Sequence, residues 1–247
     1  FGVSHRKTAS TYGVSEYLET FAGDLLRDEI INAKKLLSSQ KRPMTTIISG
    51  AKISTKLTLI KKLISKSDNV ILGGGILNTF LKAMGHEVGD SLIEDSFIGE
   101  AEEILNSNDS DKILMPIDVM VSSSSDLDNP EIREISMVQS NDKILDIGKK
   151  TIDCYNKVIT ESSTIFWNGP LGYVEKSPFD NGTIKISKAI ASSQAYSVVG
   201  GGDTIPIIES LKLQNKFSCL STGGGSLLKF IEGEKLPVLE MLGMYEL

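Results

Sequence analysis

The sequence predicts an α/β fold with three layers, in which an open, mostly parallel sheet carries helices on both faces. Strand-like and helix-like segments alternate from residue 43 onward, a pattern typical of parallel sheets built from βαβ units. Several strand-like segments are apolar at successive rather than alternate positions, as expected where both faces of a sheet are covered. Three glycine triplets also follow apolar runs and precede helix-like segments, so they predict turns between strands and helices.

The first element is a helix at residues 22–37, where apolar side chains recur at spacings of three and four until Pro43 ends the segment. Strands are then expected at residues 44–49, 69–72, 112–115, 143–147, 163–167, 196–199 and 217–221. Helices are expected between them at residues 54–65, 77–84, 98–105, 150–158, 183–191, 205–211 and 226–232. Residues 122–130 are polar and of low complexity, and they predict a surface loop.

The two ends of the chain do not follow the strand–helix pattern. Residues 1–20 form no recognisable unit, and the sequence begins with Phe1 rather than Met. We therefore expect the chain to be the C-terminal portion of something longer. Residues 236–247 follow an apparent helix end and predict a tail that docks elsewhere.

Composition excludes several classes of function. The 247 residues are 40% hydrophobic with a net charge of −6, which argues against nucleic acid as a partner. Apolar runs stay well short of the roughly 20 residues that span a bilayer. Cys154 and Cys219 lie far apart without metal-ligand spacing, which favours a reducing cytoplasm. His5 and His86 stand alone, so the chemistry should need no histidine base.

The glycine triplets at residues 73–75, 200–202 and 223–225 predict a site for phosphate. Glycine allows backbone N–H groups at a helix start to approach an anion without obstruction by a Cβ atom. One triplet alone is equally well explained as a tight turn, but three on one chain favour a phosphate site. The P-loop motif GxxxxGK[ST] is absent, and no triplet completes the dinucleotide motif GxGxxG.

Charged residues near two predicted helix starts could act on such a phosphate. Lys52 and Lys56 are four residues apart, so in a helix they would share one face near its N-terminus. Asp203 and Thr204 follow the second triplet and could bind Mg²⁺ beside phosphate oxygens. Solvated surface lysines and simple N-capping by Asp203 are the alternatives. The turn after Trp167 could likewise be simple turn chemistry or one wall of an adenine slot, with Glu175 placed to accept from ribose hydroxyls.

These residues together resemble the phosphoglycerate kinase family over nearly the whole chain. The matching segments are residues 1–6, 50–56, 73–80, 145–148, 167–170, 200–204 and 221–225. Their order and their number make the resemblance highly specific. Departures from the family pattern are Ser49 in place of glycine, Lys149 in place of proline and Cys219 in place of histidine.

The resemblance implies roles for individual residues. Lys56 would contact nucleotide phosphates, and Lys52 would stabilise the phosphoryl group during transfer. Asp203 would bind Mg²⁺. The adenosine pocket would consist of Gly50, Ala51, Gly73, Gly74, Leu92, Pro170, Tyr173 and Glu175. The phosphates would be surrounded by Gly201, Gly202 and Thr204, and the triplet Gly223, Gly224 and Gly225 would begin a helix aimed at the transferred group. Arg6 would bind 3-phosphoglycerate.

The resemblance also implies a Rossmann-like lobe of a two-lobe kinase. Residues 1–20 would be the end of an absent N-terminal lobe, 21–42 the interdomain helix, 43–235 the nucleotide-binding domain, and 236–247 a tail returning to the absent lobe. The expected reaction is reversible phosphoryl transfer from 1,3-bisphosphoglycerate to Mg-ADP, giving 3-phosphoglycerate and ATP in glycolysis. We expect a cytoplasmic monomer that is inactive as an isolated chain.

Two other functions are compatible with parts of the sequence. A non-catalytic nucleotide-binding module without a substrate lobe would show the same glycine turns. A dinucleotide-dependent oxidoreductase would share the fold, but the failure of GxGxxG argues against it.

Overall fold

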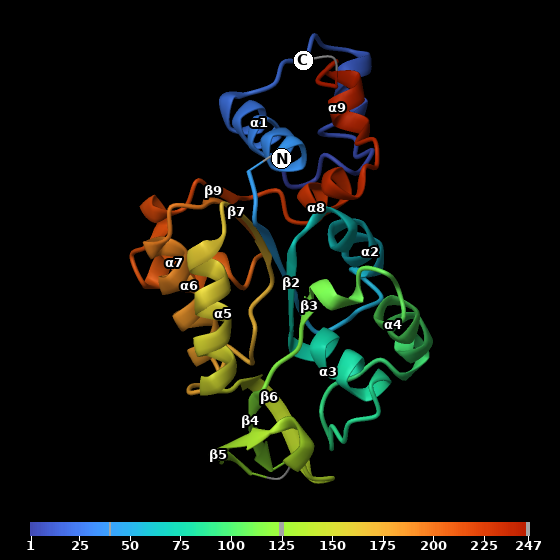
Figure 1. The fold of residues 1–247 in the computed structure, drawn as a ribbon. Helices are drawn as coiled ribbons and strands as arrows, with labels where there is room; N and C mark the ends of the chain where they lie inside the picture. The colour runs from blue at the N-terminus through green and yellow to red at the C-terminus, as the bar shows by residue number, and fades with distance from the viewer. Residues whose placement is uncertain (40, 124–125, 246–247) are drawn as a thin grey trace.

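The computed structural model describes residues 1–39, 41–123 and 126–245, and a six-stranded parallel sheet forms their centre (Figure 1). The strand order is β3-β2-β1-β7-β8-β9. The strands span Met44–Ser49 (β1), Asn69–Gly73 (β2), Ile113–Leu114 (β3), Thr164–Asn168 (β7), Tyr196–Gly200 (β8) and Cys219–Ser221 (β9). The predicted fold class is therefore confirmed.

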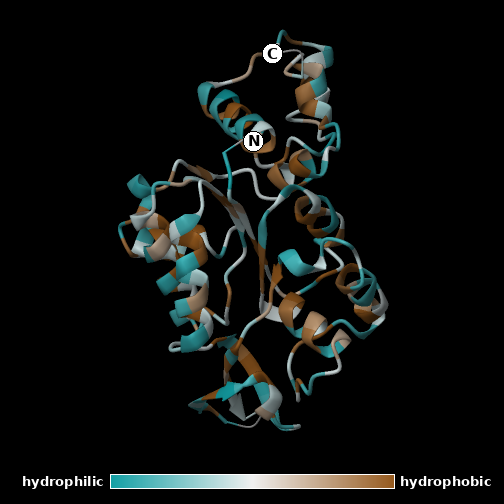
Figure 2. Cartoon of the chain, viewed as in Figure 1, coloured by the Kyte–Doolittle hydropathy of each residue, from teal (hydrophilic) through white to brown (hydrophobic). Residues whose placement is uncertain are grey.

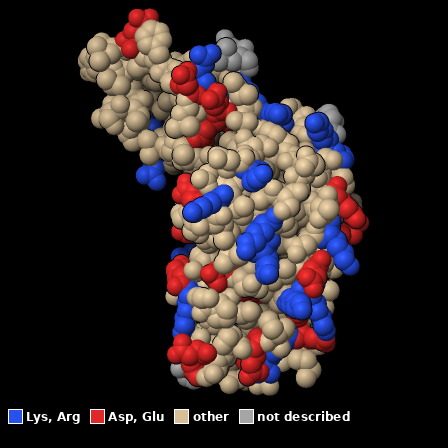
Figure 3. Space-filling model, turned by 90° about the vertical axis from the view of Figure 1, so that its left-hand side faces the viewer, with Lys and Arg blue, Asp and Glu red and all other residues tan. Residues whose placement is uncertain are grey.

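Helices cover both faces of this sheet. On one side lie α2 (Leu57–Lys66), α3 (Gly74–Ala83) and α4 (Ile98–Leu105), and on the other lie α5 (Lys149–Glu161), α6 (Asn181–Ser192) and α7 (Ile205–Ser210) (Figure 1). Every residue of β1 and β7 is buried, and the apolar colour concentrates in the sheet and the inner sides of the helices (Figure 2). Charges of both signs are interspersed over the face turned outward by α5–α7 (Figure 3).

A second, three-stranded antiparallel sheet corrects two predictions. Its order is β5-β4-β6, with β4 at Asp118–Ser123, β5 at Asp126–Glu134 and β6 at Asp142–Ile147. The strand predicted at residues 143–147 is present, but it belongs to this sheet rather than to the parallel one. Apolar residues show that a strand is half-buried without showing which strand it pairs with.

The surface loop predicted at residues 122–130 is wrong for the part that the structure describes, because these residues belong to β4 and β5; residues 124 and 125 lie outside it. Most of β5 is exposed, because it is an edge strand paired with β4 alone. A polar edge strand has the composition of a loop, and an edge also tolerates Pro130.

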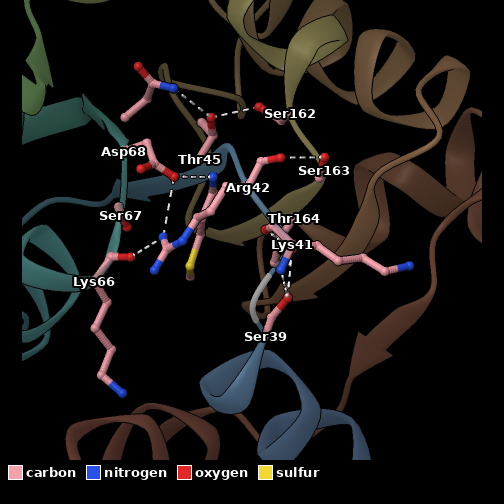
Figure 4. A network of polar contacts seen from close by, with 12 residues as sticks. Ser39, Lys41, Arg42, Thr45, Lys66, Ser67, Asp68, Ser162, Ser163 and Thr164 are labelled. Carbon is pink, nitrogen blue, oxygen red and sulfur yellow. Dashed lines mark hydrogen bonds and ion pairs between the residues drawn. The ribbon is translucent and has the colours of Figure 1, made fainter.

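A polar network fastens the segment that follows α1 (Asp24–Ser38) to the amino edge of the parallel sheet. The Arg42 guanidinium donates to the Lys66 carbonyl and lies 3.3 Å from Asp68 (Figure 4). Asp68 in turn accepts from the Met44 backbone N–H at 2.6 Å. On the other side, the Ser163 hydroxyl donates to the Arg42 carbonyl at 2.8 Å. These contacts fix the start of β1 between β2 and β7.

The two ends of the described chain pack together. The first residues, α1, α8 (Gly225–Glu232) and α9 (Pro237–Met241) lie at the end of the molecule opposite the small sheet (Figure 1). The backbone N–H of Val238 donates to the Ser4 carbonyl at 3.3 Å. The tail predicted from residue 236 thus contains a helix docked on the N-terminal segment, and residues 246 and 247 lie outside the described chain. The predicted domain boundaries stay predictions.

Candidate functional site

Five neighbouring strands of the parallel sheet end in the segments singled out from the sequence. In spatial order β2, β1, β7, β8 and β9, they lead into residues 73–75, 50–56, 169–172, 201–204 and 222–225. The chain leaves β1 toward β2 and returns to β7 on its other side, so the strand order reverses between β1 and β7. Open α/β sheets bind ligands in the crevice at such a reversal, beside the carboxyl ends of the strands.

A cavity of about 570 Å³ lies at this edge, within the size range of small-molecule sites. Its lining includes eight of the predicted nucleotide-binding residues, which are Gly50, Ala51, Gly74, Leu92, Pro170, Tyr173, Glu175 and Asp203. The opposite wall comes from the small sheet, through Lys143, Ile144 and Leu145 of β6. The cavity therefore lies between the two sheets.

Close backbone approach explains the glycines at the start of α3. Gly74 has φ +60°, and a Cβ atom there would lie 2.8 Å from the Gly50 carbonyl oxygen. A Cβ atom on Gly75 would collide with the Ala51 carbonyl oxygen. Gly73 lies beneath the cavity wall, where a Cβ atom would lie 2.5 Å from Ser49 Oγ. Glycine at these positions lets the β1 and β2 turns meet directly under the cavity.

Lys56 extends beneath the same wall. Its ammonium donates to the Ser49 carbonyl and lies 3.2 Å from the position of a Cβ atom on Gly50 and 3.1 Å from one on Gly169. Burial lowers the pKa of Lys56 to about 8, while the Asp203 carboxylate acts in the opposite direction. A half-buried cation thus faces a carboxylate across the β1, β7 and β8 turns.

Lys52 and Lys56 do not share a helical face as predicted. Helix α2 begins at Leu57 with Lys56 as its N-cap, and Lys52 is in the preceding turn. The buried side chain of Ile53 lies between them and directs the turn inward, leaving Lys52 exposed and Lys56 partly covered. The helix predicted at residues 54–65 starts too early, because the two lysines of the turn have the four-residue spacing of a helix although the helix begins only at Leu57.

The β8 turn carries an unpartnered polar atom. Thr204 is fully buried, and its hydroxyl has no hydrogen-bond partner within the described chain. Asn168, also buried, donates to the Gly200 carbonyl at 2.8 Å and holds the turn against β7. A buried hydroxyl without a partner is costly, and this one belongs to the turn that carries Asp203. Gly201 and Gly202 precede Thr204 in the same turn and do not line the cavity described above.

The next turn joins α1, α8 and the N-terminal segment. Glu29 of α1 is buried and accepts from the Ser221 hydroxyl, the Thr222 backbone N–H at 3.0 Å and the Thr222 hydroxyl at 2.5 Å. Gly224 is the N-cap of α8 and Gly225 its first residue. This carboxylate fixes the turn that leads into the helix start.

Arg6 lies next to that helix start through His5. The His5 ring makes a 2.6 Å contact through Nδ1 with Ser226 Oγ, and Arg6 Nε donates to His5 Nε2 at 3.2 Å. Burial first and the Arg6 charge second lower the pKa of His5. Arg6, Gly224 and Gly225 therefore form a second group of predicted residues, beside the end of β9 and apart from the lining of the cavity.

Sequence reasoning missed several residues of the site. Asp90, Ser91 and Lys143 line the cavity, but no motif or spacing marks them. Asn168 and Glu29 carry signals that were readable only in part: Asn168 ends an apolar strand, whereas Glu29 looks like any polar residue of an amphipathic helix.

The fold and cavity define an α/β protein with a ligand site at the switch point of its sheet, the class to which many nucleotide-binding proteins belong. A family model described as phosphoglycerate kinase matches residues 1–234. The chain therefore belongs to the phosphoglycerate kinase family.

Named relatives and solved structures agree. Phosphoglycerate kinases of Baumannia cicadellinicola and Buchnera aphidicola are 46% and 44% identical, each over 98% of this chain. The structure of phosphoglycerate kinase from Coxiella burnetii is similar with a TM-score of 0.89 at 38% identity, covering 98% of this chain and 63% of that one. The structure of phosphoglycerate kinase from Pyrococcus horikoshii is similar with a TM-score of 0.87 at 29% identity, covering 99% of this chain and 63% of that one. The chain spans 62% of the length of the two named relatives.

Proposed function

We propose that this chain forms the nucleotide-binding part of a phosphoglycerate kinase, which transfers a phosphoryl group reversibly between 1,3-bisphosphoglycerate and Mg-ADP. The observation that carries the proposal is the cavity at the switch point, lined by eight residues expected to bind nucleotide, with the Lys56 ammonium beneath its floor. Family membership supports the same reaction.

The cavity suits a nucleotide oriented with its base toward Leu92 and its phosphates toward Lys56 and Asp203. Gly50, Ala51, Gly73, Gly74, Pro170, Tyr173 and Glu175 would form or support the adenosine pocket. Gly201 and Gly202 would leave backbone N–H groups open to phosphate oxygens, and Thr204 would lie beside the phosphates, as the family resemblance implies. These assignments deepen the sequence-based expectation and are tested by binding measurements.

Asp203 fits a role in holding Mg²⁺. Magnesium in nucleotide sites uses one or two carboxylates together with phosphate oxygens and water, and a dedicated cluster of three or more acidic, cysteine or histidine ligands is not found among the described residues. When bound, the ion would neutralise phosphate charge. A single carboxylate beside a phosphate site is the donor set that this arrangement requires.

Transfer between an acyl phosphate and ADP joins groups that are already anionic, so it requires no general base. Catalysis then rests on alignment and on stabilisation of the charge of the transferred group. Lys52, exposed at the turn, and the α8 start at Gly224 and Gly225 would supply that stabilisation. Arg6 would hold the acidic substrate beside α8. A glycolytic enzyme of this kind would act in the cytoplasm, and a monomeric state stays a prediction.

Calorimetric titration of the 247-residue chain tests the proposal. Mg-ADP should bind, whereas absence of binding by folded protein at millimolar ligand would contradict it. Turnover should be undetectable without a further substrate-binding lobe, because among the four arginines of the sequence only Arg6 lies in a segment that matches the acid-substrate site of the family. Arg42 and Arg133 pair with Asp68 and Asp142 elsewhere, and Arg27 is exposed on α1. Rapid turnover by the purified 247-residue chain alone would show that a second lobe is dispensable.

The same titration separates an enzyme part from a non-catalytic module. Titration with 3-phosphoglycerate should give a heat of binding in the parent chain and none in Arg6→Ala. A chain that binds Mg-ADP but shows no response to 3-phosphoglycerate, even when a separate N-terminal lobe is supplied, would favour the non-catalytic alternative.

A further inference from the structure

Glu94 links two segments of the site, the turn after β1 and the segment that follows α3. It lies just beyond Leu92, on the wall that follows α3, and its carboxylate reaches the lysine turn after β1. Glu94 Oε2 accepts from the Ser54 backbone N–H at 2.8 Å, and Oε1 accepts from the Ser54 hydroxyl at 2.7 Å. Ser54 stands midway between Lys52 and Lys56 in the sequence, so this bidentate contact holds the middle of the lysine turn.

The backbone of Glu94 is fixed from the other side. Its N–H donates to the Thr79 hydroxyl at 3.2 Å, and that hydroxyl donates to the Gly75 carbonyl at 2.8 Å. One residue earlier in α3, the Asn78 side chain donates to the Leu92 carbonyl at 3.2 Å. The Leu92 wall is therefore tied to the first turns of α3, and Glu94 extends this connection to the lysine turn.

Charge strengthens the contact. Partial burial raises the pKa of Glu94, but the hydrogen bonds from Ser54 and the nearby Lys52 ammonium outweigh it and keep the pKa below the ordinary value. Glu94 is therefore ionised at neutral pH, and hydrogen bonds to an ionised acceptor are stronger than neutral ones. The turn is also held by the buried Ile53 side chain, by the 2.9 Å bond from the Lys56 N–H to the Ile53 carbonyl, and by the 2.9 Å bond from the Thr55 hydroxyl to the Lys52 carbonyl.

We propose that Glu94 is a positioning residue, which holds Lys52 and Lys56 in register with the wall that receives the nucleobase. The inference rests on the proposed nucleotide site. A base packed against Leu92 restricts the segment carrying Glu94, and Glu94 passes that restriction to the turn between the two lysines. The contact between Glu94 and Ser54 therefore contributes more to the binding of the phosphates than to the binding of adenosine.

The test compares adenosine, AMP and ADP, the last with Mg²⁺, by calorimetric titration of the parent chain and Glu94→Gln. Glutamine keeps the size of the side chain but has one acceptor oxygen instead of two and carries no charge. We expect the ADP dissociation constant to rise about three- to tenfold, since a charge-assisted bond is weakened, and that of adenosine to change less than twofold. Asp95→Asn, at the neighbouring exposed carboxylate, is the matched control and should leave all three constants unchanged.

Ser54→Ala supplies a second variant that keeps the backbone bond and removes only the hydroxyl bond. It should shift ADP binding in the same direction by a smaller factor, and in the double variant with Glu94→Gln the two effects should not add, because both act on one contact. Thermal melting of each variant establishes that it is folded.

The outcomes separate the two proposals. A parent chain that binds none of the ligands contradicts the proposed nucleotide site itself. A parent that binds ADP, with Glu94→Gln equal to it or weakened equally for adenosine and ADP, leaves the nucleotide site standing and overturns the positioning role. Additive effects of Glu94→Gln and Ser54→Ala would also overturn it.

Discussion

The lowered pKa of Lys56 predicts that nucleotide affinity falls with pH in a range where most lysines do not titrate. In the protein without nucleotide, the Lys56 side chain has a pKa of about 8 because it is buried under the β1 and β7 turns. Only its protonated form attracts phosphate, so binding should weaken as pH rises through 8. An ordinary lysine, with a pKa of 10.5, would show no change below pH 9.5.

The magnitude follows from the protonated fraction. With a pKa of about 8, that fraction falls from about nine-tenths at pH 7 to about one-tenth at pH 9, so the association constant for Mg-ADP should fall about tenfold if the bound form requires the proton. The terminal phosphate of ADP is largely ionised over this range, since the second pKa of a phosphate group lies near 6. Calorimetric titration between pH 6.8 and 9.5 in several buffers measures both the affinity and the proton taken up on binding.

Two variants identify the titrating group. Lys56→Met should bind Mg-ADP about 5- to 100-fold more weakly at pH 7, as expected for loss of a charge-assisted contact, and with no inflection near pH 8. Lys157→Ala, at an exposed lysine of α5, should behave like the parent. The reasoning is refuted if the parent shows no inflection between pH 7 and 9, or if Lys56→Met retains it.

Three further predictions concern stability and are measured by urea unfolding. Glu29→Ala should lower the free energy of unfolding by about 1–3 kcal/mol, because it leaves the buried Ser221 hydroxyl and the backbone N–H of Thr222 without an acceptor. Asp28→Asn, at an exposed neighbour, should have little effect. Burial raises the pKa of Asp146 to about 7 from 3.8, so between these values the folded chain retains a proton that the unfolded chain has lost, and stability falls as pH rises; Asp146→Asn should flatten that fall, and an unchanged slope would contradict the burial argument. Gly169→Ala should cost more than about 1 kcal/mol, since φ is +95° and the added Cβ atom would collide with the Ser49 carbonyl, whereas Gly99→Ala, in open space on α4, should be neutral or slightly stabilising.

The sequence predicts the parallel sheet well because its signals are local. Strand β1 coincides with the predicted residues 44–49, since a run of mostly β-branched residues bounded by Pro43 and Gly50 is fully buried in the centre of the sheet. Strand β5 has no such signal: most of its side chains face solvent, and it is a strand because its backbone pairs with β4. Its existence depends on a partner that composition does not reveal.

The residues of the candidate site also fall into those with a local sequence signal and those without one. The turns at Gly50, Gly74 and Asp203 are marked by glycine and charge directly after a strand, so they could be predicted. Lys143 and Asp90 line the cavity only because the small sheet and the loop after α3 fold over the carboxyl edge. Their role arises from tertiary approach, which leaves no pattern in neighbouring residues.

The meeting of the two chain ends has a consequence for how the site is completed during folding. The contact between His5 and Ser226 closes a loop of 221 positions, and the bond from Val238 to Ser4 closes one that is longer still. Contacts of such long range bring their reward only after the conformational entropy of most of the chain has been given up. Arg6 should therefore reach its place beside α8 among the last events of folding, after the parallel sheet has formed. A ribosome-bound chain that has not yet released α8 and α9 could assemble the β1 and β2 turns, but it could not yet hold the arginine at the helix start.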